Sequence, residues 1–124
     1  MKKVYIVAAK RTAIGKFMGS LSPFNPGELG ALVIKEIIKE SGISPGNIDS
    51  VIAGNILSAG QLQGVARQAA VKGGVPVEIP AYSLNMVLLF YQLMTKFMLH
   101  KPKSLNILLK KKIVLLLMDV QTIF

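Results

Sequence analysis

Two stretches of the sequence combine glycine with basic side chains and could hold an anion. The range 10–16 places three basic residues around Gly15, but it lacks the glycine and lysine spacing of a phosphate-binding loop. The range 60–67 joins an expected strand to an expected helix, where free backbone amides can bind an anion. Simpler interpretations are favoured for both: a solvated strand-to-loop segment for the first and a tight glycine turn for the second.

Residue types that could act as nucleophiles, general bases or metal ligands are scarce in the sequence. The 124 residues contain no cysteine, which excludes disulfides, thiolate zinc sites and cysteine nucleophiles among them. The single histidine, His100, has no neighbouring acid or nucleophile in the sequence, so a surface position is favoured. Lys110, Lys111 and Lys112 could touch acidic lipid or nucleic acid, but no aromatic residues are interleaved, and a solvated charge run is favoured. We expect no catalytic, metal or cofactor site from these residues, no nucleic-acid partner and no membrane contact.

The elements that would position these residues alternate between strand and helix. The β-branched, apolar range 3–9 predicts a buried strand. Asn25, Pro26 and Glu28 have the pattern of a capped helix start, and Gly42 marks the end of the helix over 26–41. Further elements are expected after it: a turn over 45–48, a strand over 50–54, a helix over 64–72 and a strand over 81–87. The order β-α-β-α-β predicts an α/β layer with parallel or mixed pairing.

Residues 88–124 differ in composition from residues 1–87. All eleven glycines lie in the first range, and the second contains no Gly, Ala, Glu or Arg but ten Leu and six Lys. The net charge of +9 is shared between the two ranges, with nine basic and five acidic residues in the first and six basic and one acidic in the second. We therefore expect two segments with different histories, 1–87 and 88–124.

No targeting segment is recognisable in the sequence. The apolar stretch over 4–9 is interrupted by Lys10 and Arg11, too early for a signal peptide. The apolar run over 113–118 is too short to span a bilayer. A cytoplasmic location is the expectation.

Three blocks of residues, read together, resemble the thiolases. The range 4–17 is similar to the opening strand and loop of that family. The range 54–70 is similar to the stretch after its second strand, through Gly54-Asn55-Ile56-Leu57, Gly60-Gln61 and Ala66-Arg67-Gln68-Ala69-Ala70. The range 80–87 is similar to the strand that leads into the active site. The resemblance covers residues 1–87, is specific to biosynthetic acetyl-CoA acetyltransferases, and corresponds to the first part of a typical subunit.

The resemblance implies an acyltransferase with two related α/β halves, assembled as dimers or tetramers. Thiolases condense two acetyl-CoA molecules to acetoacetyl-CoA, or run the reverse cleavage. A cysteine at a helix start accepts the acyl group, and a second cysteine moves the substrate proton. Histidines and an asparagine-held water form the oxyanion sites, and a loop domain holds coenzyme A. Coenzyme A thioesters are thus the partners that the resemblance implies for the parent family.

The chain departs from the family pattern at the nucleophile. After Ser83-Leu84-Asn85-Met86-Val87 the family continues Cys-Gly-Ser-Gly, whereas this chain continues Leu88-Leu89-Phe90-Tyr91. Because Leu88 has no lone pair to offer an acyl carbon, covalent acyl transfer is excluded at this position, and we expect the chain to be inactive. Met18 and Leu62 also stand where the family usually has glycine, which predicts strained loops.

Two explanations of the range 88–124 stay open. The first is a shifted reading frame downstream of a thiolase start, ending at an early stop, since richness in Leu, Lys, Ile, Asn and Phe suits an AT-rich gene. The second is an adaptation that makes a small membrane- or partner-binding module on a thiolase-derived scaffold. Under the first explanation, the elements that normally cover the sheet are missing, and we expect self-association or aggregation through exposed apolar sheet.

Overall fold

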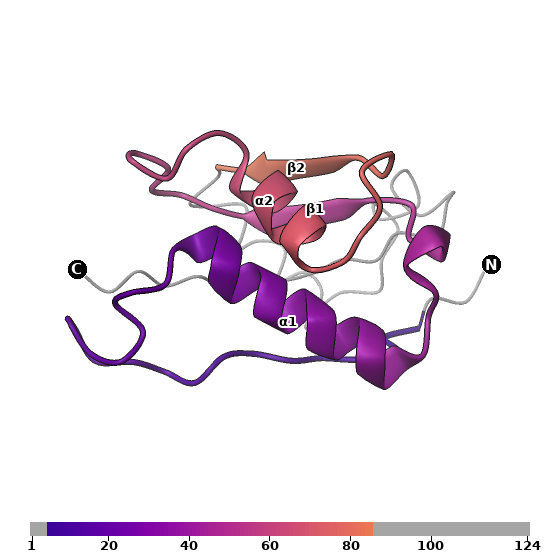
Figure 1. Cartoon of the computed structure of the whole chain (residues 1–124), viewed down its shortest axis with the longest axis horizontal. Coiled ribbons are helices and arrows are strands. Elements are labelled where there is room, and N and C mark those ends of the chain that lie inside the picture. The colour runs from indigo at the N-terminus through magenta and orange to yellow at the C-terminus, as the bar shows by residue number, and fades with distance from the viewer. Residues whose placement is uncertain (1–4, 86–124) are drawn as a thin grey trace, which may run out of the picture.

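The computed structural model describes residues 5–85 and contains an α/β unit (Figure 1). Its elements are the helix α1 (Pro26–Ser41), a 3-10 turn (Pro45–Asn47), the strand β1 (Val51–Gly54), the helix α2 (Val65–Lys72) and the strand β2 (Ala81–Leu84). These bounds confirm the expected helices and the strand over 50–54 to within one residue at each end. They confirm the last strand as far as Leu84, while residues 86 and 87 lie outside the described range.

The helix α1 begins at the capping box that the sequence predicts. The side chain of Asn25 accepts a hydrogen bond from the backbone N–H of Glu28 at 2.9 Å, and Glu28 Oε2 accepts one from the Asn25 N–H at 3.1 Å. At the other end Gly42 adopts a left-handed conformation, with φ 65°, and its N–H donates to the Ile38 carbonyl. Local residues therefore set both ends of this helix.

The two strands form a parallel pair, with α2 as the crossover between them. Val51 lies opposite Ala81 and Gly54 opposite Leu84. The ladder continues past the end of β1, because the Asn55 N–H donates to the Leu84 carbonyl at 3.0 Å. Parallel pairing requires such a crossover connection, and the pairing confirms that part of the expected layer.

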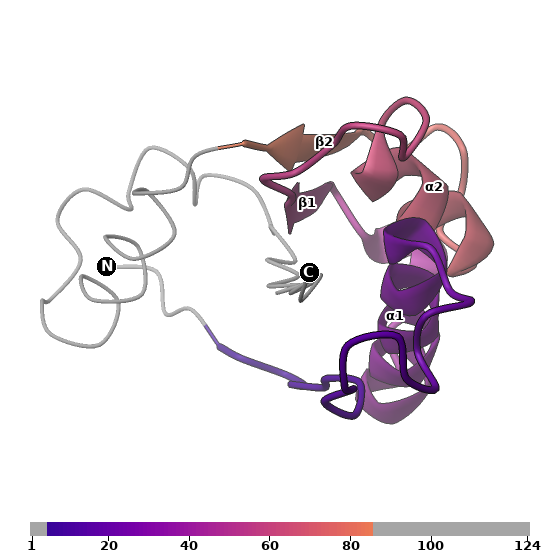
Figure 2. The ribbon, with the colours of Figure 1, turned by 90° about the vertical axis from the view of Figure 1, so that its left-hand side faces the viewer.

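The expected buried strand over 3–9 is wrong for the part that the structure describes. Residues 5–9 form no strand, and Tyr5, Ile6 and Val7 are 72%, 73% and 56% exposed. In Figure 1 this segment lies below α1 while β1 and β2 lie above it, and in Figure 2 the segment and the two strands extend from the same side of α1, apart from one another. Strand formation needs a neighbouring backbone, and no backbone hydrogen bond found for residues 5–85 outside the helices and strands involves residues 5–9. The strand propensity of residues 5–9 is therefore not enough to form a strand without a partner strand.

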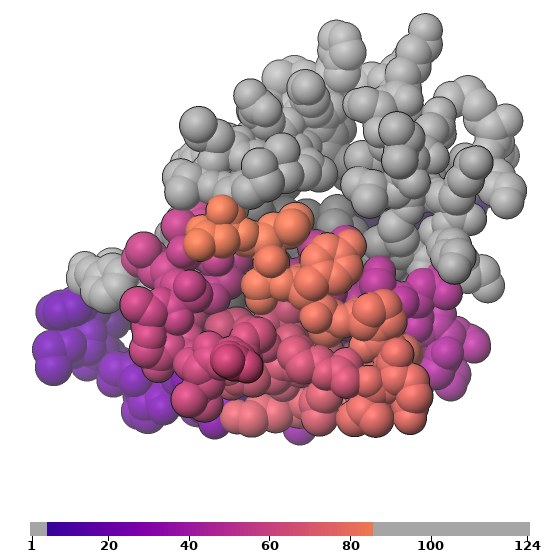
Figure 3. All heavy atoms as spheres, turned by 90° about the horizontal axis from the view of Figure 1, so that it is seen from above, coloured from indigo at the N-terminus to yellow at the C-terminus, as the bar shows by residue number. Residues whose placement is uncertain are grey.

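The core lies where α1, α2 and β1 meet. Its buried cluster consists of Ile34, Ile48, Val51, Ala69, Ala70, Val75 and Ile79. The helix α2 contributes alanines that are at most 1% exposed, which lets the two helices approach closely. At Gly73 an added Cβ would lie 2.6 Å from Ile34 Cγ2, so this glycine is required by packing. Seen from above, α2 and the segment around β2 form a continuous part of the surface (Figure 3).

Candidate functional site

The carboxyl end of β2 is where the sequence places the family's nucleophile position. Leu84, the last residue of this strand, precedes Leu88 by four residues. Leu88 itself lies outside the described residues, so the structure shows the elements that lead to the position and not its side chain. The candidate site is therefore the set of contacts that hold the end of β2 against α2 and the loop over 56–63.

Ser83 joins β2 to the start of α2. Its hydroxyl oxygen accepts a hydrogen bond from the Ala66 N–H at 3.1 Å. The residue at the N-cap of α2 is Gly64, which has no side chain to supply this bond. The strand thus caps the helix from 17 residues away, and this amide is occupied within the protein rather than offered to an anion.

The glycine-containing stretch over 60–67 is a tight connection. Gly60 and Gly64 both adopt left-handed conformations, with φ 74° and 60°. Glycine occupies this region of backbone space without a Cβ penalty. This confirms the interpretation of the stretch as a turn between strand and helix.

Three side-chain amides fix the loop over 56–63 against α2. Asn55, which is 9% exposed, donates from Nδ2 to Gln61 Oε1 at 3.0 Å. Gln68 Nε2 in turn donates to the carbonyls of Gln61 and Gln63 at 2.9 and 3.1 Å. The network holds both ends of the loop by hydrogen bonds at the carboxyl end of β1.

Arg67 fixes the chain that enters β2. Its guanidinium Nη1 donates to the Ile79 carbonyl at 2.7 Å, and Nη2 donates to the Val77 carbonyl. A planar fork with two parallel donors suits two nearby carbonyls on one segment. Arg67 therefore holds in place the segment that leads into β2.

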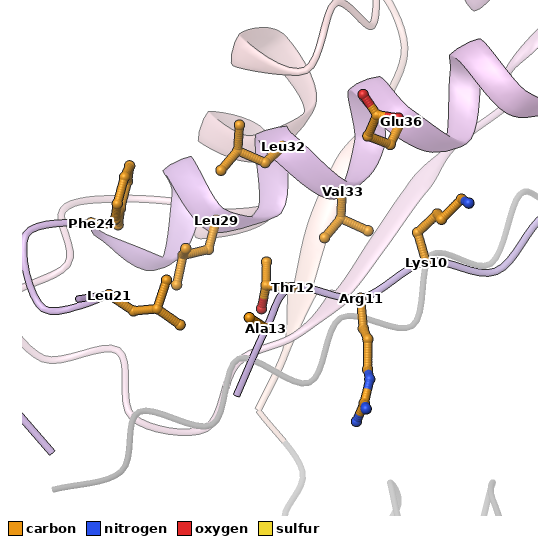
Figure 4. A pocket seen from close by; sticks show the side chains of 10 residues that line it. All are labelled: Lys10, Arg11, Thr12, Ala13, Leu21, Phe24, Leu29, Leu32, Val33 and Glu36. Atoms are coloured by element: carbon orange, nitrogen blue, oxygen red, sulfur yellow. The ribbon is translucent and has the colours of Figure 1, made fainter. Parts of the chain in front are cut away.

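The basic stretch over 10–16 lies along α1. Lys10 Nζ lies 3.0 Å from Glu40 Oε2, and both side chains are partly exposed. Between this stretch and α1 is a hollow of about 320 Å³ (Figure 4). Its lining residues are Lys10, Arg11, Thr12, Ala13, Leu21, Phe24, Leu29, Leu32, Val33 and Glu36. None of them belongs to β1 or β2, so the hollow is separate from the end of β2.

An ion pair connects the two helices. Lys72 Nζ, in the last turn of α2, lies 3.2 Å from Glu28 Oε1 in the first turn of α1. The backbone N–H of Asn25, and then the Lys72 ammonium, lower the pKa of the Glu28 carboxyl below its ordinary value. The carboxylate thus takes part in both the cap of α1 and the contact between α1 and α2.

The two positions at which the sequence predicts strained loops are strained in the structure. Met18 has φ 50° and Leu62 has φ 62°, and these are the non-glycine residues with positive φ among residues 5–85. A side chain in the left-handed region costs roughly 1–2 kcal/mol relative to glycine. Both side chains are at least 80% exposed, so neither gains burial in return.

Several candidates lie outside the described residues, including His100, Lys110, Lys111 and Lys112. Within residues 5–85 no group of three or more histidine, cysteine or acidic side chains could hold a metal ion. No helix in this range is long and apolar enough to cross a membrane.

Sequence reasoning did not find the roles of Ser83, Arg67 or the amide network. The first two contacts join residues 17 and at least 10 positions apart, so no local pattern marks them. The grouping of Asn55, Gln61 and Gln68 around a glycine turn is the one local signal that could have indicated the network.

The sequence over residues 4–88 matches the family described as "Thiolase, N-terminal domain". The chain belongs to the thiolase family. The match ends at Leu88, the position where the resemblance places the nucleophilic cysteine. The elements from α1 to β2 are thus the described part of a thiolase N-terminal domain.

Individual thiolase relatives match the same part of the chain. An acetyl-CoA acetyltransferase of Pseudomonas aeruginosa is 51% identical over 87 residues, and one of Cupriavidus necator is 48% identical over 87 residues. A probable acetyl-CoA acyltransferase of Staphylococcus aureus (strain NCTC 8325) is 49% identical over 87 residues. Each alignment covers 70% of this chain and 22% of the relative, so the chain matches about a fifth of the length of these relatives.

Proposed function

We propose that residues 1–87 are the N-terminal segment of an acetyl-CoA C-acetyltransferase, and that this 124-residue chain does not itself catalyse acyl transfer. The parent reaction joins two acetyl-CoA molecules to give acetoacetyl-CoA and coenzyme A. One observation carries the proposal: a chain about 50% identical to acetyl-CoA acetyltransferases over 87 residues has Leu88 where the family pattern has its cysteine. The parent's partners are coenzyme A thioesters, and the proposed location is the cytoplasm.

The chemistry of acyl transfer explains the proposed loss of activity. In the family reaction a cysteine thiolate attacks the thioester carbonyl carbon, a new carbon–sulfur bond forms, and the coenzyme A thiolate leaves. Leu88 offers no electron pair for that bond. No other residue among the 124 supplies a thiol, because the sequence contains no cysteine.

The described geometry supports a scaffold that holds the strand leading towards position 88. Ser83 and Leu84 anchor β2 to α2 and to Asn55, so the strand that precedes the nucleophile position is held on both sides. The proposed boundary falls three residues after Leu84, the last residue of this strand, with a thiolase segment over 1–87 and a divergent segment over 88–124. The change in composition at this point supports that division.

An assay of acetoacetyl-CoA thiolysis tests the proposal. The loss of the absorbance of the magnesium enolate of acetoacetyl-CoA is followed after addition of coenzyme A, with an active thiolase as the positive control. The purified chain is expected to show the background rate, because removal of a covalent nucleophile costs on the order of 10⁴ or more in rate. Leu88→Cys is expected to stay inactive, since the Gly-Ser-Gly that follows the family's cysteine is also replaced. Turnover that persists after removal of host thiolase would overturn the proposal.

A further inference from the structure

We propose that the loops over 14–20 and 56–63 together bind the surface of an anionic lipid bilayer. The proposal goes beyond acyl transfer and does not depend on the absence of activity. It rests on three properties of the described residues: exposed apolar side chains in both loops, a strained backbone at the two most exposed of them, and the positive charge of the stretches that carry them.

The two loops lie at the same end of the unit. The loop over 14–20 precedes α1, and the loop over 56–63 follows β1. Both are at the left in Figure 1, and in Figure 2, where that side faces the viewer, both lie in front. A single external surface can therefore contact both loops at once.

Large apolar side chains of both loops are exposed to solvent. Ile14, Phe17 and Met18 lie within five residues of one another and are 76%, 64% and 80% exposed. In the other loop Leu62 is 83% exposed and Leu57 is 52% exposed. Single exposed apolar residues are ordinary, but a group of them at one end of a protein marks an interaction surface, because their removal from water is favourable.

The two most exposed of these side chains are carried on strained backbone. Met18 and Leu62 have φ 50° and 62°, a region that favours glycine. They are also the most exposed large apolar residues among residues 5–85, so the fold gives them no burial in return for the strain. Strained residues concentrate at sites of function, where contact with a ligand or partner compensates for their cost. Insertion into the headgroup region of a bilayer supplies the burial that the fold does not.

Both loops come from stretches of sequence that contain no acidic residue. The range 1–27 has five basic residues and no acid, and the range 50–77 has two basic residues and no acid. Lys16 lies between the exposed apolar residues of the first loop, and Arg11 shortly precedes them. Neither takes part in the two ion pairs described for residues 5–85. Apolar side chains interleaved with basic ones are typical of segments that lie at the surface of anionic membranes.

The charge of this end favours a bilayer over other occupants. Glu28, the first acidic residue of the chain, lies 3.2 Å from Lys72, so its negative charge is already paired. A second copy of the chain would bring the same positive charge to the contact, and the two copies would repel each other. Nucleic acid offers phosphate groups but leaves apolar side chains of this kind in water. An anionic bilayer supplies both the negative charge and an apolar layer beneath it.

Vesicle flotation with the full chain tests the proposal, because bound protein rises with the vesicles and aggregates do not. The wild-type chain is expected to float with phosphatidylglycerol–phosphatidylcholine vesicles and not with pure phosphatidylcholine. Met18→Gly and Leu62→Gly are each expected to weaken binding by about tenfold through loss of the inserted side chain. Glycine also relieves the strain at these positions, so misfolding does not explain such a loss. Val77→Gly is the matched control, because Val77 is 58% exposed and lies before the amino end of β2, and it should bind as the wild type does.

Charge variants separate these loops from the basic run over 110–112. Lys16→Gln is expected to weaken binding to the anionic vesicles by about fivefold, as for one basic residue near such a surface. A variant with glutamine at all three positions over 110–112 should still depend on Met18 and Leu62 for its binding. Three results would overturn the proposal: no flotation of the wild-type chain, equal flotation with both kinds of vesicle, or binding that is lost with the lysines over 110–112 and kept in a Met18→Gly, Leu62→Gly double variant.

Discussion

The Ser83 hydroxyl accepts a hydrogen bond from the Ala66 N–H at 3.1 Å, so the strand that leads to position 88 also caps the helix α2. Ser83→Ala removes this cap and leaves the Ala66 amide without its partner. We expect the free energy of unfolding to fall by about 1 kcal/mol, as for the loss of an N-cap. Urea denaturation followed by circular dichroism measures it. Ser44→Ala is the control, because Ser44 precedes the 3-10 turn without a side-chain cap bond; an equal loss in both variants would contradict the assigned role.

Glu28 links the stability of the unit to pH. Its pKa is lowered in the folded state, first by the Asn25 N–H and then by Lys72, so its stabilising contribution is present above the unfolded pKa. That contribution is lost as the pH falls through the lowered folded pKa. Glu28→Gln is therefore expected to reduce the pH dependence of unfolding in the acidic range, measured by thermal melts at a series of pH values. Glu36→Gln, on the same helix and in neither described ion pair, should retain the wild-type dependence.

Glycine at position 18 or 62 should stabilise the chain. Both residues have positive φ, and glycine removes a Cβ penalty of roughly 1–2 kcal/mol while costing about 0.5–1 kcal/mol through a freer unfolded chain. Met18→Gly and Leu62→Gly are each expected to raise the free energy of unfolding by on the order of 0.5–1 kcal/mol. Met18→Ala and Leu62→Ala keep the Cβ and serve as controls. If the alanine variants gain as much as the glycine variants, backbone strain is not the cause.

Arg67 should not be replaceable by lysine. Its guanidinium donates to the carbonyls of both Val77 and Ile79, and a lysine ammonium cannot reproduce this planar fork. We expect Arg67→Lys to lower the free energy of unfolding by about 1.5–3 kcal/mol, the range for a hydrogen bond to a charged group. The exposed Arg11→Lys is the control and should have little effect. Unchanged chemical denaturation of Arg67→Lys would refute the role of the fork.

The parts of the fold that follow local rules are the parts that the sequence predicted. The capping box of Asn25 and Glu28 fixes the start of α1, and the left-handed Gly42 fixes its end. Each device involves residues close together in the sequence, so each is recognisable as a sequence pattern. The expected strand over 3–9 shows the opposite case in its described part, residues 5–9, because strand formation depends on a partner strand that local composition does not reveal. For the same reason, the contact of Ser83 with Ala66 depends on the parallel pairing of distant segments. Position 88 was predicted from the family pattern, since it has no local signature.

The genomic DNA from the codon of Val87 onward tests most directly whether the thiolase segment ends at this residue. We predict that a one-base change of frame directly after this codon yields Cys-Gly-Ser-Gly and then continues as thiolase sequence. Leu88 would then be the first residue translated in the shifted frame, at the codon where the original frame encodes the nucleophilic cysteine. If no frame downstream of Val87 encodes that continuation, the frame-shift origin of residues 88–124 is contradicted, and the segment is an adaptation of its own.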